Sequence, residues 1–157
     1  MLAALHGPGA LVDIGAGPGH LRRWLQPERI SRYIAVDRFP PPAEAADGPV
    51  PAERIQASVE TWQPPAIAIG ALTACEVLDL VDAPGKVIER LAGQFASVGC
   101  VIVSMVAAPD GKPNWRRAAA RVWDGLEATR WPVIDRVRVE SRAAGLAWEI
   151  AAFRPHR

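Results

Sequence analysis

An aspartate and three glycines alternate in a short stretch near the start of the chain. The stretch reads Asp13-Ile-Gly-Ala-Gly-Pro-Gly19 and directly follows the apolar run Ala10-Leu-Val12. Glycine accepts positive φ at no steric cost, so a loop rich in glycine can turn sharply and let a ligand approach its backbone. The stretch is therefore a candidate ligand-binding loop between a buried strand and a following helix.

Two further polar groups stand where strands are expected to end. Asp37 closes the run 31–37, and Cys75 and Glu76 follow the apolar segment 66–74. In nucleotide-binding α/β folds, an acid about twenty residues after the glycine loop contacts the ribose hydroxyls. Ligands in open α/β sheets bind beyond the carboxyl ends of the strands, so we expect Asp37, Cys75 and Glu76 to lie beside the glycine loop.

The elements that must position these residues form a doubly wound α/β domain. Apolar runs predict parallel strands, and helical spacing predicts helices from His20 to Leu25, over 84–95 and after a capping Asn114. Five prolines in 39–53 exclude a full helix there. Two alternating runs at the end predict an antiparallel hairpin. The predicted parallel strands are 10–12, 31–37, 54–57, 66–74 and 100–106, and the hairpin strands are 133–140 and 146–153.

The pattern Asp13-x-Gly15-x-Gly17-x-Gly19 resembles motif I of the class I S-adenosylmethionine (SAM) dependent methyltransferases. A mostly parallel seven-stranded sheet that ends in an antiparallel hairpin is the Rossmann-like fold of that family. The resemblance implies a methyltransferase with SAM as its cofactor. The cofactor-binding residues that it implies are Asp13, Gly15, Ala16, Gly17, Asp37, Arg38, Ser58, Val59 and Cys75.

An NAD-linked oxidoreductase is the first alternative. Its fingerprint, G-x-G-x-x-G, requires glycine at position 20, where this chain has His20. A NAD-binding domain would also continue with a parallel sixth strand. Asp37 suits both cofactors and does not discriminate between them.

Residues 75–79 admit three chemical interpretations. Cys75 could be a covalent nucleophile, but the Glu76 charge would raise the thiol pKa. Glu76 and Asp79 resemble part of the Glu-x-x-Glu-His metal motif of small-RNA methyltransferases, but Leu80 replaces the histidine, so we expect no metal. Glu76 could act as a general base or orient the substrate, and it is the candidate catalytic residue.

Composition indicates one globular domain over 1–157. Half of the 157 residues are hydrophobic and the net charge is +1, which gives no argument for bulk nucleic-acid binding. Nucleic acid stays open as an acceptor because three arginines follow Asn114 at helical spacing. Two cysteines and no long apolar run favour a cytoplasmic protein without a membrane segment.

Residues 1–9 are too short for the N-terminal helices that cover the active site in many class I methyltransferases. We therefore expect a single domain that lacks this cap. A partner subunit or a second copy of the chain would then cover the site, and a non-catalytic SAM-binding module is the second alternative. The sequence leaves the methyl acceptor unidentified, with a small metabolite favoured over RNA or protein.

Overall fold

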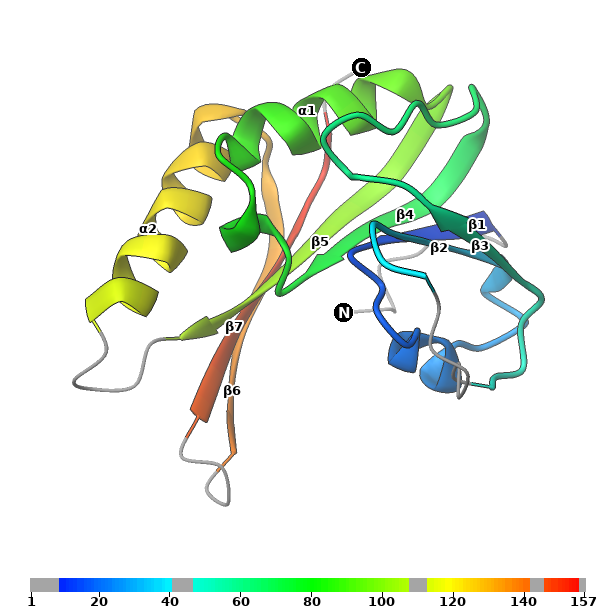
Figure 1. The fold of residues 1–157 in the computed structure, drawn as a ribbon, viewed down its shortest axis with the longest axis horizontal. Helices are drawn as coiled ribbons and strands as arrows, with labels where there is room; N and C mark the ends of the chain where they lie inside the picture. The colour runs from blue at the N-terminus through cyan, green and yellow to red at the C-terminus, as the bar shows by residue number, and fades with distance from the viewer. Residues whose placement is uncertain (1–8, 41–46, 108–112, 142–145, 156–157) are drawn as a thin grey trace.

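A seven-stranded sheet runs through the molecule in the order β3-β2-β1-β4-β5-β7-β6 (Figure 1). The computed structural model describes residues 9–40, 47–107, 113–141 and 146–155. Strands β3, β2, β1, β4 and β5 pair in parallel, and β7 pairs antiparallel with both β5 and β6. The strands are β1 (Gly9–Ile14), β2 (Ile30–Asp37), β3 (Ala52–Gln56), β4 (Ala68–Cys75), β5 (Ser97–Ala107), β6 (Val133–Ser141) and β7 (Leu146–Phe153). The predicted fold class is confirmed, and the antiparallel β7 differs from the parallel sixth strand of a NAD-binding domain.

The sheet has an apolar cluster on each face, which explains the unbroken apolar runs of its inner strands. Along β1, Leu11 belongs to one cluster, whereas Val12 and Ile14 belong to the other. The order of the strands changes direction at β1, which lies between β2 and β4. This switch point places the carboxyl ends of β1, β2 and β4 around one crevice.

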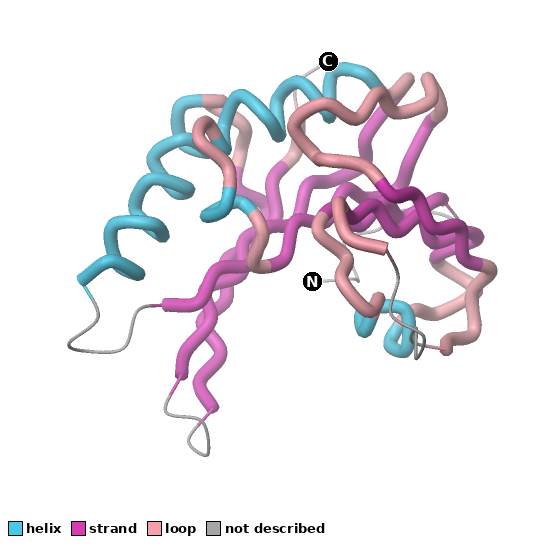
Figure 2. The backbone as a smooth tube through the Cα atoms, in the orientation of Figure 1, coloured by secondary structure: helices cyan, strands magenta, loops and turns pink. Residues whose placement is uncertain are grey.

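Helices α1 (Pro84–Gln94) and α2 (Pro113–Ala128) cover one face of the sheet (Figure 2). Ile88 and Leu91 of α1, together with Val122 and Leu126 of α2, are buried against it. The short 3-10 helix η3 (Leu78–Leu80) lies between β4 and α1. None of the described helices is long and apolar enough to cross a membrane.

The helix predicted from His20 to Leu25 is wrong in kind. The chain forms only a five-residue 3-10 helix, η2 (His20–Trp24), and Leu25 is already extended with φ −75° and ψ 142°. Pro27 disfavours a helical conformation at the residue before it, so the helix cannot continue. The side chain of Trp24 is 74% exposed, whereas that of Leu25 is buried.

The predicted cap of the following long helix is also wrong. Helix α2 begins at Pro113, a residue that favours the first helical position because it needs no N–H partner. Asn114 lies inside the helix, and its Oδ1 accepts a hydrogen bond from Arg117 at 2.8 Å. Most of the loop predicted before this helix, and the turn of the hairpin at 142–145, lie outside the described residues.

Candidate active site

The glycine loop folds back onto the end of β2. Gly15 and Ala16 donate their backbone N–H groups to the carbonyl of Val36 at 2.8 and 3.2 Å. Gly15, Gly17 and Gly19 all have positive φ, between 50° and 79°. A Cβ on Gly15 would lie 2.4 Å from Cγ2 of Val77, so this position excludes any side chain. Glycine is thus required at Gly15 by both conformation and space.

Asp37 joins the glycine loop to the end of its own strand. Its Oδ2 accepts the N–H of Gly17 at 2.8 Å, and its Oδ1 accepts the N–H of Phe39 at 2.9 Å. Each carboxylate oxygen has a further lone pair, so the group retains the capacity to accept from a ligand. Asp37 is only partly buried and lines two adjoining cavities.

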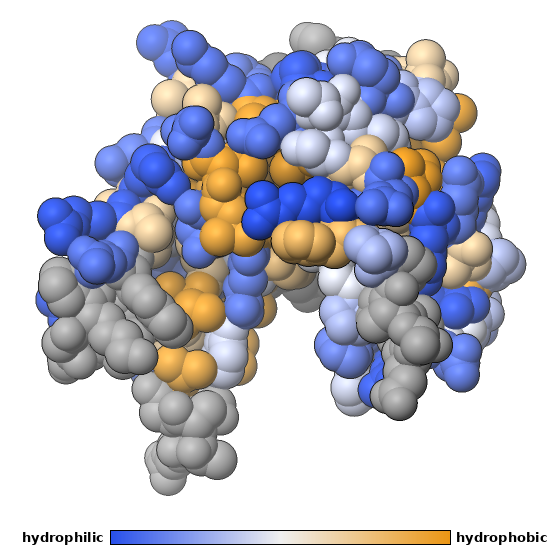
Figure 3. Space-filling view, viewed as in Figure 1, coloured by the Kyte–Doolittle hydropathy of each residue, from blue (hydrophilic) through white to orange (hydrophobic). Residues whose placement is uncertain are grey.

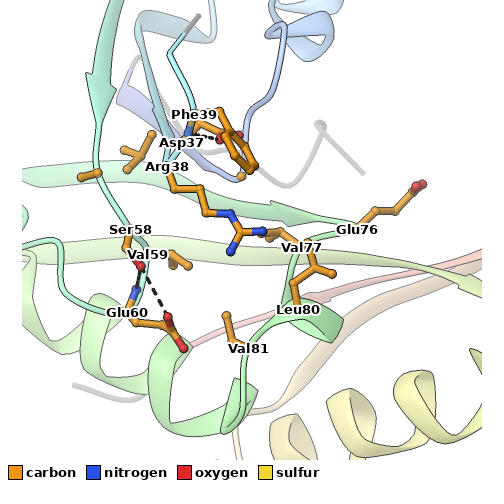
Figure 4. A pocket seen from close by; sticks show the side chains of 13 residues that line it. Asp37, Arg38, Phe39, Ser58, Val59, Glu60, Glu76, Val77, Leu80 and Val81 are labelled. Carbon is orange, nitrogen blue, oxygen red and sulfur yellow. Dashed lines mark hydrogen bonds between the residues drawn. The ribbon is translucent and has the colours of Figure 1, made fainter.

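The first of these, called here the Asp37 cavity, has a volume of about 120 Å³ (Figure 4). It lies beyond the carboxyl ends of β1, β2, β3 and β4. Six residues predicted for the site line it, namely Gly15, Asp37, Arg38, Ser58, Val59 and Glu76. The adjoining Gly17 cavity, of about 100 Å³, is lined by Ala16, Gly17 and Asp37 among others. Residues far apart in the sequence therefore meet at one crevice.

The remaining wall of the Asp37 cavity was not predicted. It includes Phe39, Glu60, Val77, Leu80 and Val81. Phe39 and Leu80 are large apolar residues that are 63% and 65% exposed. Hydrophobic residues gather near the centre of the face seen in Figure 3, beside hydrophilic ones. The available sequence signal was Phe39, an aromatic residue two positions after Asp37.

Arg38 crosses the Asp37 cavity. In Figure 4 its side chain extends from the end of β2 toward Val77. Its guanidinium carbon also lies 4.8 Å from the centroid of the Phe39 ring, a cation–π distance. A positive charge therefore stands between the β2 side and the η3 side of the cavity.

The loop after β3 is held in place from α1. Ser58 accepts the backbone N–H of Glu60 with its hydroxyl and that of Trp62 with its carbonyl. Arg90 of α1 donates to the carbonyl of Val59 at 2.6 Å and to that of Trp62 at 2.9 Å. Arg90 was not singled out from the sequence, because a charged residue inside a predicted helix gives no local signal of these contacts.

Asp13 is buried beneath the glycine loop. It is only 4% exposed, and it accepts hydrogen bonds from the hydroxyls of Tyr33 at 2.5 Å and Thr73 at 2.7 Å. Burial raises the pKa of Asp13 above its usual value, although the two hydrogen bonds oppose this. Asp13 is not among the residues that line the three cavities described here. Its predicted contact with a ligand ammonium group stays a prediction.

Cys75 ends β4 beside this buried group. Desolvation raises the pKa of its thiol to about 11, and the charges of Asp13 and Glu76 act in the same direction, against a hydrogen bond with Ser104. A thiol with this pKa carries little thiolate near neutral pH and is a poor nucleophile. Cys75 lines none of the three cavities, so its cofactor contact also stays a prediction.

Glu76 lies where β4 leaves the sheet, with φ at 55°. Its N–H donates to the carbonyl of Ser104 at 2.9 Å, and its Oε1 accepts the indole N–H of Trp148 at 2.5 Å. In Figure 4 its carboxylate points away from Arg38 and Val77. Trp148 was missed because it follows Glu76 by 72 residues and reaches it only through the antiparallel β7.

Glu76 also lines a third cavity, called here the Met105 cavity, of about 200 Å³. Its other lining residues are Asp79, Met105, Val106 and Ala118. Within the described residues, no three side chains of histidine, cysteine, aspartate or glutamate form a group that could hold a metal ion. The described residues at this end of the site thus contribute two carboxylates and an apolar wall.

Comparison with known proteins identifies the family. A family model described as "Methyltransferase domain" matches residues 1–150. A trans-aconitate 2-methyltransferase of Pseudomonas aeruginosa is 32% identical over 119 residues, which are 71% of this chain and 38% of that protein. The chain thus spans less than half the length of this curated relative.

Two solved structures share the fold. The N-methyltransferase NodS of Bradyrhizobium japonicum, in complex with S-adenosylhomocysteine (SAH), has a TM-score of 0.73 and 17% identity, covering 99% of this chain and 84% of that one. A 1,6-didemethyltoxoflavin-N1-methyltransferase of Burkholderia thailandensis has a TM-score of 0.70 and 19% identity, covering 99% and 76%. The family match, the glycine loop and the sheet order agree: the chain belongs to the class I SAM-dependent methyltransferase family, whose cofactor is SAM.

Proposed function

We propose that this chain transfers the methyl group of SAM to an acceptor at the Asp37 cavity and its surroundings. The observation that carries the proposal is the meeting of Gly15, Asp37, Ser58 and Glu76 at one cavity beyond the strand ends. Three of these come from the loops after β1, β2 and β3, where the family binds its cofactor. Membership of the family supplies the reaction class.

Each part of the cofactor has a proposed contact. The carboxylate of Asp37 accepts from the ribose hydroxyls, while the backbone of Gly15, Ala16 and Gly17 approaches the amino-acid part. Asp13, which lies beneath the glycine loop, interacts with the amino-acid part of the cofactor indirectly, through water or the backbone. The adenine ring occupies the part of the cavity near Ser58 and Val59, and Arg38 moves or stacks to admit it. Cys75 contacts only the methyl-bearing end of the cofactor.

The chemistry requires little from the protein besides alignment. A nucleophile displaces SAH from the sulfonium methyl in one in-line step, and the site must hold the reacting atoms about 3–3.5 Å apart. A base is needed only if the nucleophile is protonated. Glu76 is the proposed candidate, because it lines both the Asp37 cavity and the Met105 cavity.

The acceptor is proposed to be a small molecule. The curated relative is named for a small acid, trans-aconitate, and the fold relatives include enzymes named for nitrogen methylation.

Phe39 and Leu80 leave an apolar rim exposed at the Asp37 cavity, which supports cover by a partner subunit or a second copy. Sedimentation of the purified chain tests the proposal of a covering subunit, because a strict monomer with full activity would contradict it.

Calorimetric titration of the purified chain with SAH, with NAD as the control ligand, tests the proposed function. We expect micromolar binding of SAH and none of NAD. Binding of NAD, or a folded chain that binds neither, would contradict the proposal that this chain by itself forms a methyltransferase cofactor site. A folded chain that binds neither ligand would favour a site that another subunit completes.

A further inference from the structure

The Met105 cavity adjoins the proposed cofactor site and has a different character. Its wall comes from the segment after β4, from η3, from β5 and from α2. Glu76 is the residue that it shares with the Asp37 cavity. A molecule in the Met105 cavity would therefore meet the cofactor site at Glu76. A volume of about 200 Å³ suits part or all of a small metabolite rather than a folded macromolecule.

The charges of this cavity favour one class of ligand. Among the described residues that line it, Glu76 and Asp79 carry carboxylates and the other three are apolar. The guanidinium of Arg121 in α2 donates to the backbone carbonyl of Asp79 at 2.7 Å. A carboxylate ligand would be placed against two like charges, whereas an amine would meet two acceptors.

A buried atom of Asp79 supports the same conclusion. Its Oδ1 is shielded from solvent and accepts no hydrogen bond from the described residues. An acceptor that is buried without a partner destabilises the folded state. An N–H donor bound in the cavity wall beside Asp79 would supply the missing hydrogen bond.

Trp148 sets the direction of the Glu76 carboxylate. Its indole N–H donates to Oε1 at 2.5 Å, which leaves Oε2 for a ligand. The register of β5 and β7 places Trp148 opposite Val106, itself a lining residue. The same strand pair thus builds the apolar wall and orients the carboxylate.

We propose that the Met105 cavity is the acceptor site, that it takes a small molecule with an amino group on an apolar body, and that Trp148 is the positioning residue for Glu76. The proposal rests on the proposed methyl transfer at the adjoining site. The bound ammonium first gives a proton to the Glu76 carboxylate, which passes it to solvent. The nitrogen lone pair then forms the new N–C bond while the electrons of the S–C bond pass to sulfur, which releases SAH and leaves the methylated nitrogen as an ammonium.

Two probes of similar size separate this proposal from a carboxylic acid acceptor. Phenethylamine and 3-phenylpropionate share the aromatic ring and a two-carbon spacer but carry opposite charges. Each is titrated into the full chain already saturated with SAH. We expect phenethylamine to bind at least tenfold more tightly than 3-phenylpropionate. Equal binding, tighter binding of the acid, or binding of neither to an SAH-loaded chain would overturn the proposal.

Substitutions of residues that line the Met105 cavity test whether phenethylamine binds there. Glu76→Gln and Asp79→Asn should each weaken phenethylamine binding about tenfold, and Asp79→Asn, at a residue that is not among those lining the Asp37 cavity, should leave SAH binding within threefold. Glu89→Gln, on the exposed side of α1, is the matched control and should change neither affinity. Failure of SAH to bind the unaltered chain would instead count against the proposed function, so the two failures are distinguishable. Unchanged phenethylamine affinity in both acidic variants would overturn the assignment of the cavity.

A double-mutant cycle tests the role of Trp148. Trp148→Phe keeps the aromatic packing and removes the N–H donor, and we expect phenethylamine affinity to fall about threefold to tenfold. In the Glu76→Gln background the same change should have no further effect, because the oriented carboxylate is already absent. Additive losses in the double variant would show that Trp148 acts independently of Glu76 and would overturn its positioning role.

Discussion

Asp37 connects the glycine loop with the segment after β2. Its two oxygens accept the N–H groups of Gly17 and Phe39 while the residue lines the cavity. Asp37→Ala should weaken SAH binding by roughly 100-fold or more, since the proposed hydrogen bonds from both ribose hydroxyls would be lost and hydrogen bonds to a charged group contribute about 1.5–3 kcal/mol each. Calorimetry measures this loss. Asp124→Ala, exposed on α2, is the control, and equal affinities in the two variants would contradict the role of Asp37.

The thiol of Cys75 should be unreactive despite its exposed position. Its pKa is raised to about 11, and that of the buried Cys100 is also raised to about 11. An ordinary thiol titrates near 8.5, so at pH 8 the thiolate of Cys75 should be scarcer by a factor of roughly 100 or more. Alkylation by iodoacetamide, followed by mass spectrometry against N-acetylcysteine, should be slower to a similar degree. Labelling as fast as that of the reference thiol would restore the covalent-nucleophile interpretation.

At the scale of elements, the glycine loop depends on Gly15. Alanine there would have φ at 68° and a Cβ 2.4 Å from the Val77 side chain. We expect Gly15→Ala to lower the stability by about 2 kcal/mol and Tm by roughly 4–8 °C, and to weaken SAH binding. Gly93→Ala in α1 is the matched control, because its Cβ would meet nothing within 4 Å. Thermal unfolding of the two variants in parallel measures the difference in Tm, and similar Tm values would contradict the requirement for glycine at position 15.

The elements were predictable to different degrees. Buried strands such as β5 follow from apolar runs, because burial on both faces leaves a clear pattern. The prediction of a longer helix at His20 was wrong because it relied on the spacing of Leu21 and Leu25 and gave too little weight to Pro27, which ends the helix after one turn. The prediction that Asn114 caps the long helix was wrong because Pro113 already begins that helix. Local patterns predict where an element lies better than where it ends.

Candidate residues were predictable where a residue ends a strand or directly follows one. Gly15, Asp37, Ser58 and Glu76 were predicted in this way, and all four line the Asp37 cavity, while their roles stay predictions. Trp148 and Arg90 were not predicted, because their contacts depend on the pairing of β7 and on the packing of α1. Those contacts join residues 28 to 72 positions apart, and no local pattern encodes them.

At the scale of the whole molecule, Asp13 should affect stability as a function of pH. Burial raises its pKa above 3.8, so between 3.8 and the raised value the folded state binds more protons than the unfolded state. The contribution of Asp13 to stability is therefore greatest at low pH and falls as pH rises through that interval. Tyr33 and Thr73 reduce the effect by donating hydrogen bonds to the carboxylate.

Asp13→Asn isolates this contribution, because the variant lacks the titrating carboxyl group and keeps the other ionisable groups. The difference in unfolding free energy, wild type minus variant, should decrease from pH 4 to pH 8. Urea unfolding at a series of pH values measures it. A difference that stays constant, or rises with pH, would contradict a raised pKa of Asp13 in the folded chain.

We propose that one crevice, at the carboxyl ends of β1, β2, β3 and β4, holds the methyl donor. A crystal structure of the chain in complex with SAH would show where the cofactor product binds. We expect the adenosine in the Asp37 cavity, with both ribose hydroxyls on the Asp37 carboxylate and the homocysteine end beside Gly15. SAH bound elsewhere, or bound there without contact to Asp37 and the glycine loop, would contradict it.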